Sequence, residues 1–137
     1  MTGFSGGCLC GAIRYEVTGE PMRTAICHCD NCRRTTGSAF ATNIFVNEGD
    51  LKIVKGTPKQ FQHPTDSGAT MTKEFCGDCG SPLFGYSSRG GGLKNVKVGS
   101  IDDARFVKPQ IEVYTIRKLP YVHLLDETEH YEMNRPR

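Results

Sequence analysis

The sequence predicts a single all-β domain with one short helix, held together by bound zinc. Two observations carry this prediction. Short stretches with strand character recur between glycine and proline clusters, and seven cysteines stand in three tight groups. The length of 137 residues suits one domain, residues 1–137, with a hydrophobic core of its own.

Strand predictions rest on the alternation of apolar and polar side chains. In the clearest case, Ile13, Tyr15 and Val17 alternate with two charged residues, which is the pattern of a strand with one buried face. The turn at residues 47–50 is expected to join two strands in a hairpin. Strands are predicted over residues 12–17, 40–46, 51–54, 70–75, 82–86, 93–98 and 111–116.

Helix signals are few. One short helix is predicted over residues 30–37, where Asp30 offers an N-terminal cap and Gly37 a terminator. Residues 132–137 are expected to form a frayed tail at the end of the chain.

Composition predicts a cytoplasmic protein whose main partner is neither a membrane nor a nucleic acid. No segment approaches the roughly 20 apolar residues of a membrane span, and residues 1–7 lack the features of a signal peptide. The formal net charge is +2 with cysteines counted as neutral. Seven thiolates would remove seven charges and two zinc ions would restore four, which leaves a net charge of about −1.

The cysteines form a C-x-C pair, a C-x-C-x-x-C group and a C-x-x-C pair. Thiolates two or three residues apart can bind one metal ion with little ordering of the chain, and adjacent glycines allow tight turns around it. Four thiolates would form a closed structural zinc site, whereas three would leave a position for water or substrate. This partition assigns the structural zinc to Cys8, Cys10, Cys76 and Cys79, and the catalytic zinc to Cys27, Cys29 and Cys32.

The structural site would close a long loop between Cys10 and Cys76. Closing roughly 66 residues costs about 4 kcal/mol in chain entropy. A structural zinc contributes about 10–16 kcal/mol, so its binding outweighs the closure.

Other uses of the cysteines remain as alternatives. Disulfides are disfavoured by the odd count and a reducing compartment, and an iron–sulfur cluster would leave three cysteines unexplained. The serious alternative is a second closed zinc site, completed by a histidine. His28 would point away from its neighbouring cysteines in an extended segment. His63, His123 and His130 stay open as ligands, although each is expected to be an ordinary histidine.

The three cysteine segments, residues 7–11, 27–33 and 75–80, resemble in order and spacing the glutathione-dependent formaldehyde-activating enzyme family, also called the centromere-protein-V-like family. The resemblance spans nearly the whole chain. It implies an Mss4-like fold of packed antiparallel sheets, two zinc ions on the ligands named above, and a carbon–sulfur lyase of the S-(hydroxymethyl)glutathione synthase type. One departure is Tyr121, which stands where the family often has a tryptophan; this chain has none.

The expected chemistry follows from the open site. Three thiolates are soft ligands, and a fourth sulfur, from a thiol such as glutathione, would suit the ion that they hold. This sulfur would add to formaldehyde or a related small carbonyl. Arg33 and Arg34 follow the last ligand directly, and they either anchor a carboxylate of the thiol or form a solvated helix face. The second zinc is expected to have low occupancy, and no general acid or base is evident.

Two further functions stay open at this stage. The open zinc could serve another small metabolite in an enzyme of the same fold. Alternatively, the domain could be a non-enzymatic, zinc-stapled module for protein interaction. An exchangeable position at the second zinc separates the enzymes from the module. The sequence does not predict the oligomeric state.

Overall fold

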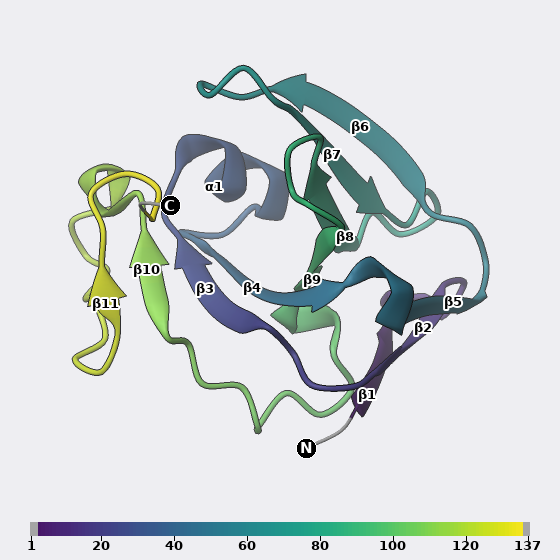
Figure 1. Cartoon of the computed structure of the whole chain (residues 1–137). Coiled ribbons are helices and arrows are strands. Elements are labelled where there is room, and N and C mark those ends of the chain that lie inside the picture. The colour runs from purple at the N-terminus through teal and green to yellow at the C-terminus, as the bar shows by residue number, and fades with distance from the viewer. Residues whose placement is uncertain (1–2, 136–137) are drawn as a thin grey trace.

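The computed structural model describes residues 3–135, which form two β-sheets, one α-helix and three short 3₁₀ turns (Figure 1). The smaller sheet has the order β1-β2-β5, and the larger has the order β11-β10-β3-β4-β9-β8-β7-β6. The small sheet comprises β1 (Gly3–Gly7), β2 (Arg14–Thr18) and β5 (Leu51–Lys55). The large sheet comprises β3 (Arg23–Cys27), β4 (Ala41–Asn47), β6 (Lys59–Pro64), β7 (Thr70–Phe75), β8 (Pro82–Ser87), β9 (Leu93–Lys97), β10 (Ile111–Val113) and β11 (Glu129–His130).

The prediction of an all-β protein with a single helix is confirmed by this architecture. Most neighbouring strands run antiparallel, but β10 runs parallel to both β3 and β11. The hairpin expected at residues 47–50 is wrong, because β4 pairs within the large sheet whereas β5 crosses to the small sheet and pairs with β2. Residues 98–110 carry the chain from β9 beneath the sheet to β10, as Figure 1 shows. A long connection of this kind lets a strand enter beside a parallel neighbour, which a tight hairpin turn does not allow.

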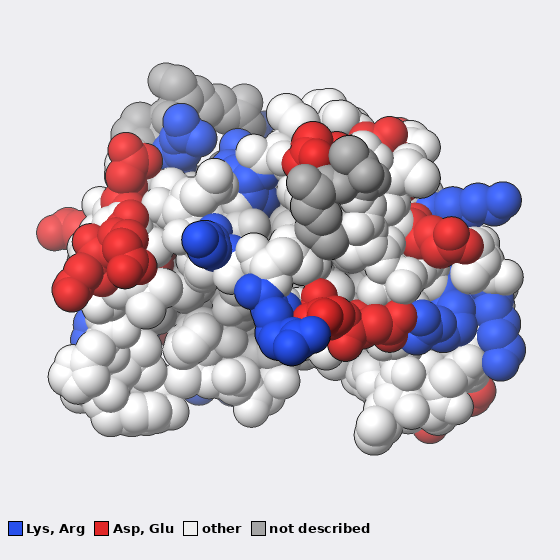
Figure 2. All heavy atoms as spheres, turned by 90° about the horizontal axis from the view of Figure 1, so that it is seen from below, with Lys and Arg blue, Asp and Glu red and all other residues white. Residues whose placement is uncertain are grey.

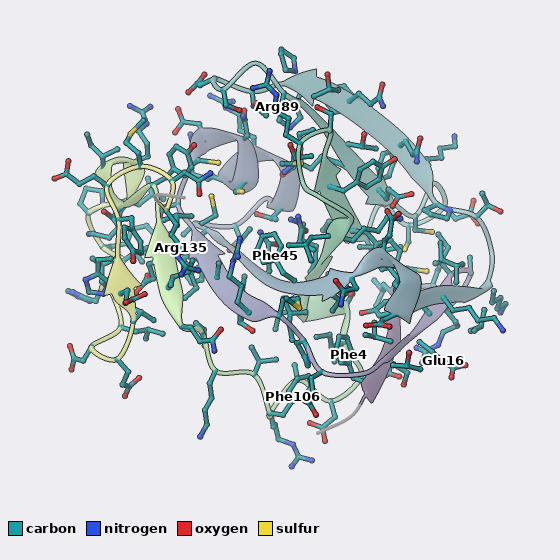
Figure 3. All side chains as sticks on the ribbon, in the orientation of Figure 1. Phe4, Glu16, Phe45, Arg89, Phe106 and Arg135 are labelled. Carbon is teal, nitrogen blue, oxygen red and sulfur yellow. The ribbon has the colours of Figure 1, made fainter. Side chains whose placement is uncertain are left out.

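The main core lies between the two sheets. Tyr15 of β2 and Phe84 of β8 are fully buried, and their rings meet edge to face with centroids 5.0 Å apart. Ile44, Val46 and Val96 pack in the same cluster from β4 and β9. At the edge of this core, the rings of Phe4 and Phe106 lie 5.5 Å apart and tie residues beyond β9 to β1 (Figure 3). One face of the large sheet is thus covered by the small sheet.

The helix α1 (Asp30–Thr36) begins one residue earlier than expected, because Cys29 rather than Asp30 is its N-cap. The Cys29 sulfur accepts a hydrogen bond from the amide of Cys32, which is the role of a capping side chain. Gly37 ends the helix with φ of 65°, and its amide donates to Arg33. The predicted terminator is therefore confirmed, and left-handed backbone explains why a glycine stands there.

The expected frayed tail is wrong for the part of it that the structure describes. The amides of Tyr114 and Ile116 donate to the carbonyls of Met133 and Glu132, at 3.0 Å and 3.4 Å. Residues 136–137 of that prediction lie outside the described residues. Residues 132–133 are therefore held against the segment that follows β10.

Charged side chains of both signs are interspersed on the face of the molecule seen from below (Figure 2). Two ion pairs on the surface join Arg14 to Asp102 and Arg105 to Asp103. Among the residues described, no helix is long and apolar enough to cross a membrane.

Replacing Phe84 with alanine tests the inter-sheet core. We expect Phe84→Ala to lower the free energy of unfolding by about 3–5 kcal/mol, because it leaves a cavity beside Tyr15. The matched control is Phe61→Ala on β6, where the ring is 57% exposed. The measurement is urea unfolding of both zinc-loaded variants. Equal losses in the free energy of unfolding would contradict this account of the core.

Candidate metal centres

The first candidate metal centre joins the two sheets. Cys8 and Cys10 lie in the connection between β1 and β2, and Cys76 and Cys79 lie in the turn between β7 and β8. Their four sulfurs lie within 4.8 Å of one another and could hold a metal ion. The Cys8 and Cys10 sulfurs are 3.7 Å apart, and those of Cys10 and Cys76 are 3.8 Å apart. Four sulfurs around zinc, at Zn–S distances of about 2.3 Å, have edges of about 3.8 Å, so the residues fit this ion.

Backbone amides surround this four-sulfur cluster. The amides of Ile13 and Asp78 donate to the sulfurs of Cys8 and Cys76, at 3.2 Å and 3.4 Å. A hydrogen bond from the hydroxyl of Ser81 contributes most to lowering the pKa of Cys79 to about 5. These donors favour the thiolate form, which is the form that binds a metal.

The second candidate metal centre lies where β3 runs into α1. Cys27 ends β3, Cys29 caps the helix, and Cys32 lies in its first turn. Their three sulfurs also lie within 4.8 Å of one another. No fourth histidine, cysteine or carboxylate joins this group among residues 3–135. In Figure 3, yellow sulfur atoms appear beside α1 and again, separately, on the right of the molecule.

The three cysteines of this cluster shift one another's pKa values. Hydrogen bonds from Cys27 and Cys32, together with the nearby charge of Lys73, hold the pKa of Cys29 well below its usual value. Hydrogen bonds with Cys29 and Cys32, together with burial, raise the pKa of Cys27. The amide of Cys32 also donates to the Cys29 sulfur, at 3.3 Å. The group is therefore suited to carry negative charge and to bind a cation.

The side chain of His28 lies between two of these cysteines in sequence but outside their cluster. It is 1% exposed, and its Nε2 lies 2.9 Å from Oε1 of Glu112, which is equally buried. Glu112 also accepts hydrogen bonds from the Leu125 amide and the Thr128 hydroxyl, both at 2.7 Å. Burial acts to raise the pKa of Glu112, but these hydrogen bonds outweigh it and hold that pKa below its usual value. This network fixes the β3–α1 connection to β10 and the C-terminal segment.

The remaining histidines lie apart from both clusters. The Nδ1 of His63 lies 2.9 Å from the carbonyl of Pro64, and the Nε2 of His130 lies 2.9 Å from the carbonyl of Leu125. His123 is exposed. The structure brings none of the four histidines into the two groups of candidate metal ligands within its described part.

The two arginines of α1 differ in their surroundings. The guanidinium of Arg33 lies 3.8 Å from Asp30, whose carboxylate also binds Arg117 at 2.6 Å. Arg34 is exposed. Tyr121, in the position of the missing tryptophan, is 72% exposed. Arg34 and Tyr121 thus stand at the surface, whereas Arg33 is half-buried.

Three residues beside the second cluster were not predicted from sequence. Tyr114 has a left-handed backbone with φ of 55°, and burial and the charges of Cys27, Cys29 and Asp66 raise the pKa of its hydroxyl. Lys73 and Lys97 are buried on β7 and β9, with 8% and 6% exposed. Strained backbone and buried charge are typical of functional sites, but neither gives a signal in the sequence.

The fold and these centres define a class: a two-sheet β-protein with two cysteine clusters, each able to hold a metal ion. Comparison with known families then gives the family. The family model described as "Glutathione-dependent formaldehyde-activating enzyme" matches residues 3–117, and the chain belongs to this family.

Individual relatives support the same conclusion. The chain is 30% identical over 102 residues, 71% of its length, to a Halomonas elongata protein provisionally named a glutathione-dependent formaldehyde-activating enzyme. It is 26% identical over 84 residues, 61% of its length, to an uncharacterized lyase of Schizosaccharomyces pombe. The matches span 64% and 58% of these relatives. A crystal structure of a Rhodobacter sphaeroides protein matches with a TM-score of 0.59 and 26% identity, covering 77% of this chain and 91% of that one.

Replacing Glu112 with glutamine tests the network behind the second cluster. The amide of Glu112→Gln cannot accept from all the donors that meet the carboxylate, so buried groups lose partners. We expect a loss of about 1–3 kcal/mol in the free energy of unfolding. Glu127→Gln, at an exposed position nearby, is the control and should change little. Denaturant unfolding at neutral pH gives both values, and an unchanged midpoint for Glu112→Gln would contradict the role.

Proposed function

We propose that the protein is a zinc-dependent carbon–sulfur lyase. It would join a thiol, glutathione or a close relative, to formaldehyde or a related small carbonyl, and would catalyse the reverse cleavage. One observation carries the proposal: two cysteine clusters in one chain differ by a single ligand, four against three. The family description and the lyase name of one relative support the choice of thiol and reaction.

Both clusters are assigned to zinc. Four thiolates complete a tetrahedron and suit a structural ion, whereas three leave one position for an exchangeable ligand. We assign the structural zinc to Cys8, Cys10, Cys76 and Cys79, and the catalytic zinc to Cys27, Cys29 and Cys32. When bound at the second cluster, zinc supplies a position for a sulfur ligand and favours its thiolate form near neutral pH.

The reaction forms one carbon–sulfur bond. An electron pair of the thiolate sulfur makes the bond to the carbonyl carbon, while the π electrons of the carbonyl move to its oxygen. That oxygen then takes a proton and becomes the hydroxyl of an S-hydroxymethyl thiol. The protein holds the three cysteines in place through the cap of α1 and through the His28–Glu112 pair. Correct placement of the sulfur and the carbonyl lowers the entropic part of the barrier.

The arginines of α1 are proposed to serve the thiol. Arg34 is exposed beside the second cluster in sequence, and Arg33 is half-buried with a weak contact to Asp30. A guanidinium binds a carboxylate through paired hydrogen bonds, and glutathione carries two carboxylates. Arg33 and Arg34 would therefore affect the affinity for glutathione rather than the chemical step.

Removing one ligand of the second cluster tests the open site. We expect Cys29→Ala to bind one zinc ion in place of two, to remain folded and to lose lyase activity on S-hydroxymethylglutathione. Thr35→Ala, on an exposed turn of the same helix, should keep both ions and the activity. Zinc content by mass spectrometry and the release of formaldehyde provide the readouts. Two ions in Cys29→Ala, with full activity, would exclude this cluster as the active site.

The first cluster has a different role, which Cys76→Ser tests. A structural zinc contributes about 10–16 kcal/mol, which matches or exceeds the whole stability of a typical domain. We therefore expect Cys76→Ser to fail to fold, whereas Cys32→Ser at the second cluster should keep the native circular dichroism spectrum. A folded Cys76→Ser protein would show that the first ion is not structural.

A further inference from the structure

Two buried lysines lie on the face of the large sheet that carries the second cysteine cluster. Residues directly opposite each other in antiparallel strands share a face of the sheet. The register pairs Lys73 of β7 with Gly85 of β8, and Gly85 in turn with Asn95 of β9. Lys97 follows two residues later on β9, opposite Asn43 of β4. These side chains therefore share one face of the large sheet, and Asn43 in turn pairs with Ala25 of β3, the strand that ends at Cys27.

Neither lysine on this face of the sheet is paired with an acidic side chain. Lys97 donates a hydrogen bond to the side-chain amide oxygen of Asn43, at 2.8 Å, and this neutral amide does not neutralise the charge of the ammonium. The side chain of Lys73 forms no hydrogen bond or ion pair with any residue in the described part of the chain. The Oδ1 atom of Asn95, buried between them, has no hydrogen-bond partner either. Because a buried charge without a partner is costly, the ammonium of Lys73 is poised to receive an acceptor.

Gly85 lies beneath the side chain of Asn95 on this face of the sheet. A Cβ atom at this position would stand 3.0 Å from the side-chain amide nitrogen of Asn95, so any larger residue would crowd the row. The strand therefore carries no side chain between the two polar groups of Lys73 and Asn95. The glycine therefore lets the Asn95 amide lie flat on the same face that carries Lys73.

The cysteine cluster is close to both lysines. The charge of Lys73 acts to lower the pKa values of Cys29 and Cys32, and the three thiolates act to raise the pKa of Lys97. Burial, followed by the like charge of Lys73, outweighs the thiolates and lowers the pKa of Lys97 to about 8. No hydrogen bond joins either ammonium to a sulfur in residues 3–135. Three thiolates, one zinc ion and two ammonium groups leave a surplus of about one positive charge, which matches a single additional anion.

We propose that Lys73 and Lys97 bind the anionic oxygen that forms when the thiol sulfur adds to the carbonyl carbon. The inference rests on the proposed function and names the groups that receive the charge. As the carbon–sulfur bond forms, the negative charge of the thiolate moves to the oxygen of an S–CH₂–O⁻ group. The ammonium groups donate hydrogen bonds to this oxygen, and water then supplies the proton of the product hydroxyl. Donors fixed in a buried site stabilise such an oxygen without reorganising, which lowers the barrier.

Two small thiols serve as stable probes of this site. Mercaptoacetate carries an anionic oxygen close to its sulfur, and mercaptoacetamide has the same shape without the charge. Each is titrated into the cobalt-substituted protein, whose visible bands report sulfur binding. The ratio of the two dissociation constants is compared between variants, so that intrinsic differences between the thiols cancel.

We expect the preference for mercaptoacetate to fall about tenfold in Lys73→Met, the loss expected for one hydrogen bond to a charged group. Lys73→Arg keeps the charge and should retain most of the preference. Lys97→Gln provides an independent variant with a similar expected loss. The control is Lys52→Met, at an exposed position on β5, which should leave the ratio unchanged.

The outcomes separate this inference from the proposed function. If both thiols shift the bands but Lys73→Met and Lys97→Gln leave the ratio unchanged, the lysines do not bind the oxygen and the inference is wrong. If neither thiol shifts the bands of the wild-type protein, the second cluster does not accept a thiol. The proposed function then falls, and this inference falls with it.

Discussion

The four-sulfur cluster is the constraint on which the rest of the structure depends. It joins the β1–β2 connection of the small sheet to the β7–β8 turn of the large sheet, across 66 residues between Cys10 and Cys76. The core between the sheets is mainly aliphatic, and Tyr15 and Phe84 form an aromatic pair within it. A metal bound between the sheets would add stability, because its binding free energy contributes to folding.

The small sheet covers one face of the large sheet, and the second cysteine cluster lies on the opposite face. Cys27, Cys29 and Cys32 lie where β3 enters α1, and the buried His28–Glu112 pair holds this connection from behind. Lys73 and Lys97 approach the same region from β7 and β9. Segments far apart in sequence thus meet around the second cluster, which gives a soft ligand set beside surplus positive charge.

Features that depend on local pattern could be predicted from the sequence. The spacing of the cysteines predicted two groups of four and three, and the structure brings the sulfurs of each group together. Alternation predicted β2, but it could not predict β3, where four of five residues are buried, or β1, which is largely glycine. Gly6 is needed in β1 because a Cβ there would stand 2.4 Å from the hydroxyl of Tyr15. Long-range packing of this kind leaves no periodic signal.

The burial of charged residues on strands could not be predicted from the sequence either. Lys73, Lys97 and Glu112 occupy positions that a sequence pattern assigns to solvent, yet all three are buried. Their burial follows from the pairing of β7, β9 and β10 within one sheet, which depends on strand order rather than on neighbours in sequence. The parallel pairing of β10 with β3 could not be predicted from the sequence either, and this pairing brings Glu112 close to His28.

The central claim is that one ion has four protein sulfurs and the other has three. Zinc X-ray absorption of the fully loaded protein, with and without glutathione, measures it directly. The account predicts an average of about 3.5 sulfurs per zinc, the mean of four and three, rising to about 4 when the thiol is added. An average of 4 sulfurs before addition, unchanged by glutathione, would contradict it, because both sites would then be closed.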